Sequence, residues 1–136
     1  MLKNLSAILL IALSSCTVMQ SLTPSKDPAQ KVLKESIRNE SKQMYMDMLS
    51  GSKDYKDYEQ RYSAILAEIN NFTAVDSVRK NASLLFKVDK KLRDAFVMRW
   101  EWHKEYGTLN DAKVSSIWDY LKTYWDAVQR SEETLK

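Results

Sequence analysis

Glycine, proline, cysteine and histidine are all scarce in this sequence of 136 residues, which contains two glycines, two prolines, one cysteine and one histidine. Disordered and low-complexity chains are usually rich in glycine and proline, so this composition favours an ordered globular domain. A single cysteine cannot form an internal disulfide, and cysteine usage therefore indicates no particular redox compartment. The formal net charge of only +3 argues against a polyanionic partner, and we expect no nucleic-acid binding.

The sequence also lacks the short motifs of common catalytic sites. It contains no Gly-rich phosphate loop, no Gly-x-Ser-x-Gly and no second cysteine for redox chemistry. The acidic neighbours of His103 are Glu101 and Glu105, each two positions away and therefore about 200° around a helix. We expect His103 to be a structural residue near a helix C-terminus, and we predict no catalytic residues, no metal ligands and no bound cofactor.

The first sixteen residues have the three parts of an export signal. Lys3 gives the start a positive charge, residues 5–13 form an apolar run of nine, and Ser14 and Ser15 precede Cys16. Nine helical residues span about 13 Å, much less than the roughly 30 Å of a bilayer core. The run is therefore interpreted as a signal peptide and not as a transmembrane helix.

Leu13-Ser14-Ser15-Cys16 resembles the lipobox of bacterial lipoprotein precursors. The resemblance implies cleavage between Ser15 and Cys16, with covalent diacylglycerol and fatty acyl groups on Cys16, and hence attachment to a membrane of the cell envelope. An aspartate after the cysteine would resemble an inner-membrane retention signal. Thr17 stands there instead, which implies an outer-membrane lipoprotein facing the periplasm. The prediction of an outer-membrane location applies only to a source with two membranes, and a source with a single membrane is the alternative.

Three regions follow from this pattern: the signal peptide at 1–15, the lipidated cysteine and a flexible tether at 16–26, and a helical domain at 27–136. Asp27 and Pro28 predict a helix start, and Gly51 predicts its end near residue 50. The apolar face of this helix should be formed by Leu33, Ile37, Met44 and Met48.

Three further helices complete the predicted domain. The second runs from residue 52 or 54 to Asn70-Asn71, and the third from a capping box at 73–76 to Tyr106, with a kink near Asn81. The fourth begins at a capping box at 108–111 and ends near Glu133. We predict an all-α fold, an antiparallel up-down bundle of about four helices.

Aromatic residues crowd the last third of the chain. A turn at Gly107 should bring them to one end of the bundle, as a site for a partner or ligand or as a Trp-rich core layer. Trp102 and Tyr120 are expected to be partly exposed. The candidate partner-binding residues are Trp102, Tyr106, Trp118 and Tyr120.

A basic stretch follows residue 78 and includes Arg79, Lys80, Lys87, Lys90, Lys91, Arg93 and Arg99. It is interpreted as a solvated helix face with local partners, such as Asp89 with Arg93. A surface for phospholipid head groups or for an acidic partner is the alternative.

These observations support three hypotheses for function. The first is a lipid-anchored envelope lipoprotein whose helical domain is a non-catalytic binding or assembly module for another envelope protein. The second is an inhibitor or immunity lipoprotein against an enzyme that attacks the envelope. The third is a ligand carrier or hydrolase that uses the aromatic end of the bundle.

Overall fold

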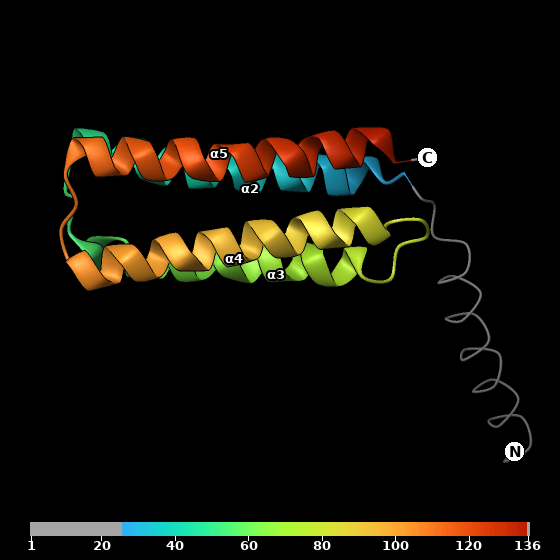
Figure 1. The fold of residues 1–136 in the computed structure, drawn as a ribbon, viewed down its shortest axis with the longest axis horizontal. Coiled ribbons are helices and arrows are strands. Elements are labelled where there is room, and N and C mark those ends of the chain that lie inside the picture. The colour runs from blue at the N-terminus through green and yellow to red at the C-terminus, as the bar shows by residue number, and fades with distance from the viewer. Residues whose placement is uncertain (1–25, 136) are drawn as a thin grey trace, which may run out of the picture.

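The computed structural model describes residues 26–135, which form four long helices in an up-and-down bundle (Figure 1). The helices are α2 (Pro28–Ser50), α3 (Glu59–Asp76), α4 (Ser83–Tyr106) and α5 (Asp111–Thr134), with a short 3-10 helix, η1 (Tyr55–Asp57), before α3. Each helix packs against the next along the chain, and α5 also packs against α2. The predicted all-α bundle is therefore confirmed, whereas the predicted signal peptide and Cys16 lie outside the described residues.

The bundle has two different ends (Figure 1). We call one the tether end, because the described chain enters there at Lys26; it also holds the connection at 77–82 and Leu135. The other is the loop end, formed by the connections at 51–58 and 107–110.

Local sequence signals explain both ends of α2. The Asp27 carboxylate accepts hydrogen bonds from the amides of Ala29 and Gln30 at 3.0 and 3.3 Å, and Pro28 occupies the first turn. A carboxylate at this position satisfies amides that lack a partner within the helix. The helix ends at Ser50, and Gly51 caps it, as the sequence predicts.

The predicted boundary between the second and third helices is wrong. α3 continues through Asn70-Asn71 to Asp76, because Phe72 is fully buried in the core and the Thr73 hydroxyl donates to the Ile69 carbonyl within the helix. The chain reverses instead at 77–82, where Asn81 adopts a left-handed conformation with φ of 59°. The expected kink near Asn81 is therefore a complete break between two helices.

The start of α5 also differs from its prediction. Asn110, and not Thr108, caps the helix by accepting a hydrogen bond from the Lys113 amide at 2.8 Å. Thr108 forms an antiparallel bridge with Asp54, and its hydroxyl donates to the Asp54 carboxylate at 2.7 Å. This bridge joins the two connections of the loop end.

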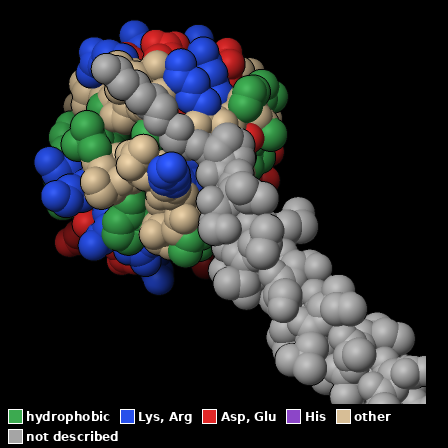
Figure 2. All heavy atoms as spheres, turned by 90° about the vertical axis from the view of Figure 1, so that its right-hand side faces the viewer, with side chains coloured by type: hydrophobic (Ala, Val, Ile, Leu, Met, Phe, Trp, Pro, Cys, Tyr) green, Lys and Arg blue, Asp and Glu red, His purple; other side chains and the backbone are tan. Residues whose placement is uncertain are grey.

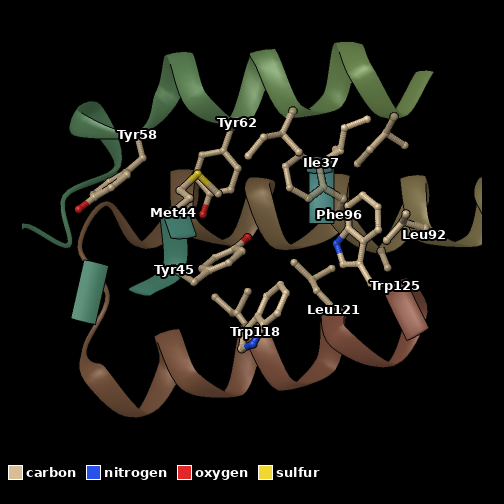
Figure 3. Close-up of a cluster of buried hydrophobic side chains, with 14 of the residues drawn as sticks. Ile37, Met44, Tyr45, Tyr58, Tyr62, Leu92, Phe96, Trp118, Leu121 and Trp125 are labelled. Carbon is tan, nitrogen blue, oxygen red and sulfur yellow. The ribbon is translucent and has the colours of Figure 1, made fainter. Parts of the chain in front are cut away.

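The core runs along the bundle axis and contains large aromatic and aliphatic side chains from all four helices (Figure 3). The Tyr62 ring stacks on Trp100 with ring centroids 5.7 Å apart, and Phe72 meets Trp125 edge-on at 6.1 Å. Each fully buried side chain of this size stabilises the fold by roughly 1.5–3 kcal/mol. The core therefore fixes the angular position of every helix, and with it the positions of surface groups.

Candidate functional site

The aromatic residues of the last third divide between the core and the surface. Trp125 is fully buried, and Trp118 is only 6% exposed and packs on Tyr45 at 6.1 Å. Trp118 therefore lies in the core and forms no part of an exposed site. The half-buried Trp100 indole donates to the Tyr55 hydroxyl at 2.9 Å, which ties α4 to the loop end.

Two aromatic side chains remain in solvent near the C-terminus of α4. Trp102 is 43% exposed and Tyr106 is 53% exposed, and their rings meet edge-on at 6.4 Å. The Lys113 ammonium, from the first turn of α5, lies 3.9 Å from the centre of the Tyr106 ring. These groups border a pocket of about 240 Å³, which is lined by Trp102, Tyr106, Leu109, Asn110, Ala112, Lys113, Ser116 and Ile117.

Arg99 completes this surface by joining α4 to α5. Its guanidinium lies 4.1 Å from the Trp102 ring centre and 4.0 Å from the Tyr120 ring centre, so two aromatic rings contact it. Tyr120 is half-buried, and its hydroxyl lies 3.1 Å from that of Tyr124. Among residues 26–135, no carboxylate forms an ion pair with Arg99. We call Arg99, Trp102, Tyr106, Lys113 and Tyr120 the aromatic surface.

The composition of the aromatic surface suits recognition of an anionic group beside an apolar one. A guanidinium held by aromatic rings loses less side-chain entropy when it pairs with a carboxylate than a freely rotating one. Tryptophan, tyrosine and arginine are also the residue types that contribute most at protein interfaces. Sequence reasoning placed Trp102, Tyr106 and Tyr120 here but missed Arg99 and Lys113. The spacing of Arg99 three residues before Trp102 was the available signal.

A second polar constellation, which sequence reasoning missed, is buried at the tether end. We call it the charge cluster: Lys34 from α2, Asp76 from α3, Arg79 from the 77–82 connection, Asp89 from α4 and Glu132 from α5. These side chains are at most 3% exposed.

Ion pairs connect the whole charge cluster. Lys34 Nζ contacts Asp76 Oδ2, lies 2.9 Å from Glu132 Oε2 and lies 3.6 Å from Asp89 Oδ1. Arg79 donates to Asp76 Oδ1 at 2.8 Å and to Glu132 Oε1 at 2.7 Å. All four helices and the 77–82 connection therefore meet at one buried polar network.

The charges of this network balance only if one carboxyl group is neutral. Burial, together with the neighbouring Asp76, raises the pKa of Asp89 to about 9. Burial alone would raise the pKa of Asp76. Hydrogen bonds from Asp89, Lys34 and Arg79 have the larger effect and hold that pKa below its ordinary value. Near neutral pH the cluster therefore holds two cations, two carboxylates and one protonated Asp89. The ion pairs of the cluster link all four helices. Because these groups are buried, the cluster offers no open site.

No family model, curated protein or solved structure matches this chain.

The basic stretch does not form one solvated face. The expected pairing of Asp89 with Arg93 is wrong, because Asp89 points into the charge cluster; Arg93 instead donates to Asn70 Oδ1 at 2.8 Å. Arg79 is buried by its two carboxylate partners. Lys80, Lys87, Lys90 and Lys91 are exposed.

His103 is built into the loop end. Its Nε2 lies 2.8 Å from the Lys53 carbonyl, and its Nδ1 lies 2.9 Å from the Tyr62 hydroxyl. The carbonyl can only accept, so Nε2 carries the proton and Nδ1 accepts from Tyr62. Burial lowers the pKa of His103, which keeps the imidazole neutral. Its two nitrogens thereby link α4, α3 and the 51–58 connection.

Residues 26–135 contain neither a cluster of metal-ligating side chains nor a membrane-spanning helix. No group of three histidine, cysteine or acidic side chains in this part of the chain could hold a metal ion. None of the helices described here is both long enough and apolar enough to cross a bilayer. Ser15 and Cys16, the predicted cleavage and lipidation residues, lie outside this range.

Proposed function

We propose that this protein is a lipid-anchored lipoprotein of the bacterial envelope whose helical bundle binds another envelope protein through the aromatic surface. The observation that carries this proposal is the Arg99 guanidinium between Trp102 and Tyr120, beside the exposed Tyr106 and Lys113. It presents cations and apolar rings together. An acidic segment of a partner protein that carries an apolar side chain would complement both features.

The size of the pocket favours a protein partner over a small ligand. Pockets for small molecules usually have volumes of about 300–1,000 Å³. The pocket beside Trp102 has about 240 Å³ and is partly bordered by the long Lys113 side chain. One apolar side chain of a partner would fill it, with the remaining contacts formed by the surrounding rings and cations.

The proposed lipid anchor rests on the resemblance of residues 13–16 to a lipobox. In this proposal Cys16 carries the lipid and residues 17–26 lead to the bundle, while Thr17 favours the outer membrane facing the periplasm. The chain enters the described structure at the end opposite the aromatic surface (Figure 1). α4 has 24 residues and spans about 36 Å, so an anchored bundle can present this surface well away from the membrane.

Crosslinking in cells would test the proposal. The lipidated protein with a C-terminal tag would be crosslinked, purified in detergent and analysed by mass spectrometry, together with Trp102→Ala, Arg99→Ala and Leu33→Ala variants. Leu33 is a matched control because its side chain is 41% exposed on α2. A central tryptophan in an interface contributes about 2 kcal/mol or more, so Trp102→Ala should weaken partner binding at least roughly 30-fold.

The outcomes separate the hypotheses. One dominant protein that is retained by Leu33→Ala and lost by Trp102→Ala and Arg99→Ala supports the proposal. If that protein is an envelope-degrading enzyme and binding inhibits it, the module is an inhibitor. Equal capture by all variants would refute the role of the aromatic surface. The lipid anchor has its own test: a Cys16→Ala variant should lose palmitate labelling.

A further inference from the structure

Two aliphatic side chains are left in solvent where the chain passes from α3 to α4. Val78 is 79% exposed and Leu84 is 63% exposed, although the neighbouring Leu85 is fully buried. Leu84 borders two hollows, one of about 310 Å³ shared with Leu135 and one of about 330 Å³ shared with Lys87 and Lys91. Both aliphatic side chains therefore lie at the outer rim of the bundle with open space beside them.

Positive charge predominates around these side chains, although Asp94 also lines the hollow that Leu84 shares with Lys87 and Lys91. Between residues 77 and 93 the only acidic residue is Asp89, which is buried in the charge cluster. Lys80, Lys87, Lys90 and Lys91 are all exposed in the same segment. This surface is therefore more basic than the chain as a whole, which is close to neutral. We call Val78, Lys80, Leu84, Lys87, Lys90 and Lys91 the tether-end patch.

The charge cluster holds this segment in its exposed position. Arg79 points inward and donates to Asp76 and Glu132, so its neighbours Val78 and Lys80 remain outside. The segment cannot bury Val78 without breaking those buried ion pairs, which would leave charges without partners. Its exposed aliphatic groups are therefore a fixed feature of the folded bundle.

The tether-end patch lies at the end of the bundle that the chain reaches first. Figure 2 looks onto this end and shows hydrophobic side chains interspersed with Lys and Arg and with some Asp and Glu. The ten residues from Thr17 to Lys26 span at most about 35 Å when extended. A lipid on Cys16 therefore places the membrane surface within reach of this end first.

We propose that the tether-end patch rests on anionic phospholipid. Val78 and Leu84 enter the region between head groups and acyl chains, and the lysines pair with lipid phosphates. The combination of exposed aliphatic groups, lysines and a nearby anchor fits a lipid surface better than a second protein, because the anchor supplies that surface at high local concentration. This inference rests on the proposed lipid anchor and is independent of the partner that binds the aromatic surface.

Fluorescence quenching on vesicles would test the patch. In the lipidated protein the Cys16 sulfur is blocked, so an introduced cysteine is the only free thiol. Ser83→Cys places a fluorophore on the exposed residue next to Leu84, and Glu105→Cys places one at the loop end. Each protein would be reconstituted into phosphatidylcholine vesicles with or without phosphatidylglycerol, with nitroxide-labelled lipid as the quencher.

We expect strong quenching of the label at position 83, little at position 105, and stronger quenching at 83 when phosphatidylglycerol is present. A Lys80→Glu, Lys87→Glu protein should lose the dependence on anionic lipid, with circular dichroism confirming that its helices are intact. Val78→Ser combined with Leu84→Ser should reduce the quenching in both kinds of vesicle.

The controls separate the two proposals. A protein whose mass lacks lipid on Cys16 would overturn the anchor and the patch together. A lipidated protein in which the labels at 83 and 105 are quenched equally, or in which neither is quenched, would overturn only the patch.

Discussion

Asp89 shows how strongly burial changes a single residue in this bundle. Its side chain is fully buried, 3.6 Å from Lys34 Nζ, and an ionised Asp89 would add a third negative charge to a site with two cations. Removing a carboxylate from water costs several kcal/mol unless its charge is compensated. Protonation of Asp89 avoids this cost and lets it share a hydrogen bond with Asp76.

The raised pKa of Asp89 predicts that stability falls as pH rises. An aspartate titrates near pH 4 in the unfolded chain and at about pH 9 in the folded one, so between these values the folded state binds one more proton. The contribution of Asp89 protonation to the free energy of unfolding is fully present below pH 4. It is lost as the pH rises towards 9, by up to about 1.4 kcal/mol per pH unit. Urea unfolding between pH 7 and 8.5 should show this decline in the wild type and much less of it in Asp89→Asn.

The groups around Asp89 define the control for this measurement. Lys34, Asp76, Arg79 and Glu132 face it from α2, α3, the 77–82 connection and α5. The lowered pKa of His103 has the opposite effect on stability, because the folded state disfavours protonation of its imidazole. This effect lowers stability when the pH drops below about 6.5, and the measurement therefore stays above pH 7. Asp94→Asn, at an exposed position, should keep the wild-type slope, and parallel profiles for all three proteins would contradict the prediction.

At the scale of elements, the connection between α3 and α4 depends on Asn81. Its φ of 59° lies in the left-handed region, which asparagine tolerates better than most residues and glycine adopts freely. This single residue lets the chain reverse while Phe72 and Asp76 stay buried on one side and Leu85 on the other.

Substitutions at Asn81 should therefore follow backbone preference. Asn81→Gly should change the free energy of unfolding by less than about 0.5 kcal/mol, whereas Asn81→Val should lower it by about 1–3 kcal/mol. Thermal and urea unfolding would measure both, with the exposed neighbour Lys80→Val as control. Equal losses in Asn81→Val and Lys80→Val would show that the left-handed turn is not what the substitution disturbs.

The elements also show what sequence reasoning can reach. Asp27, Pro28 and Gly51 act on residues within a few positions, so the bounds of α2 could be predicted. The buried face of α2 could not, because Lys34 and Ser41 lie on it while Leu33 is exposed. The partners of Lys34 are 42 and 98 residues away, and no local pattern of hydrophobic residues reveals them.

The same distinction holds for the candidate site. Exposure of Trp102 was predictable from its angle to the core position Trp100 on one helix. The contact between Arg99 and Tyr120 joins two helices, and it depends on how α4 and α5 are rotated against each other. Core packing sets that rotation, and the individual helix patterns do not contain it.

For the molecule as a whole, the bundle separates two surfaces. Leu84 and Trp102 lie eighteen residues apart on α4, which corresponds to about 27 Å along the helix. The charge cluster stabilises one end and the Tyr62–His103 network the other. The two proposed contacts, with lipid and with a partner, therefore belong to opposite ends of the bundle.

This separation predicts that the two surfaces act independently. Leu84→Ser should weaken contact with phosphatidylglycerol vesicles and leave partner capture in detergent unchanged, while Trp102→Ala should do the reverse. The double variant should show both losses. The change in its free energy of unfolding relative to the wild type should equal the sum of the two single changes within about 0.5 kcal/mol, as expected for sites this far apart. If Leu84→Ser reduced capture in detergent as much as Trp102→Ala does, the partner would span the length of α4. The tether end would then be part of the protein interface. The proposal that the tether end contacts lipid while only the loop end binds the partner would be wrong.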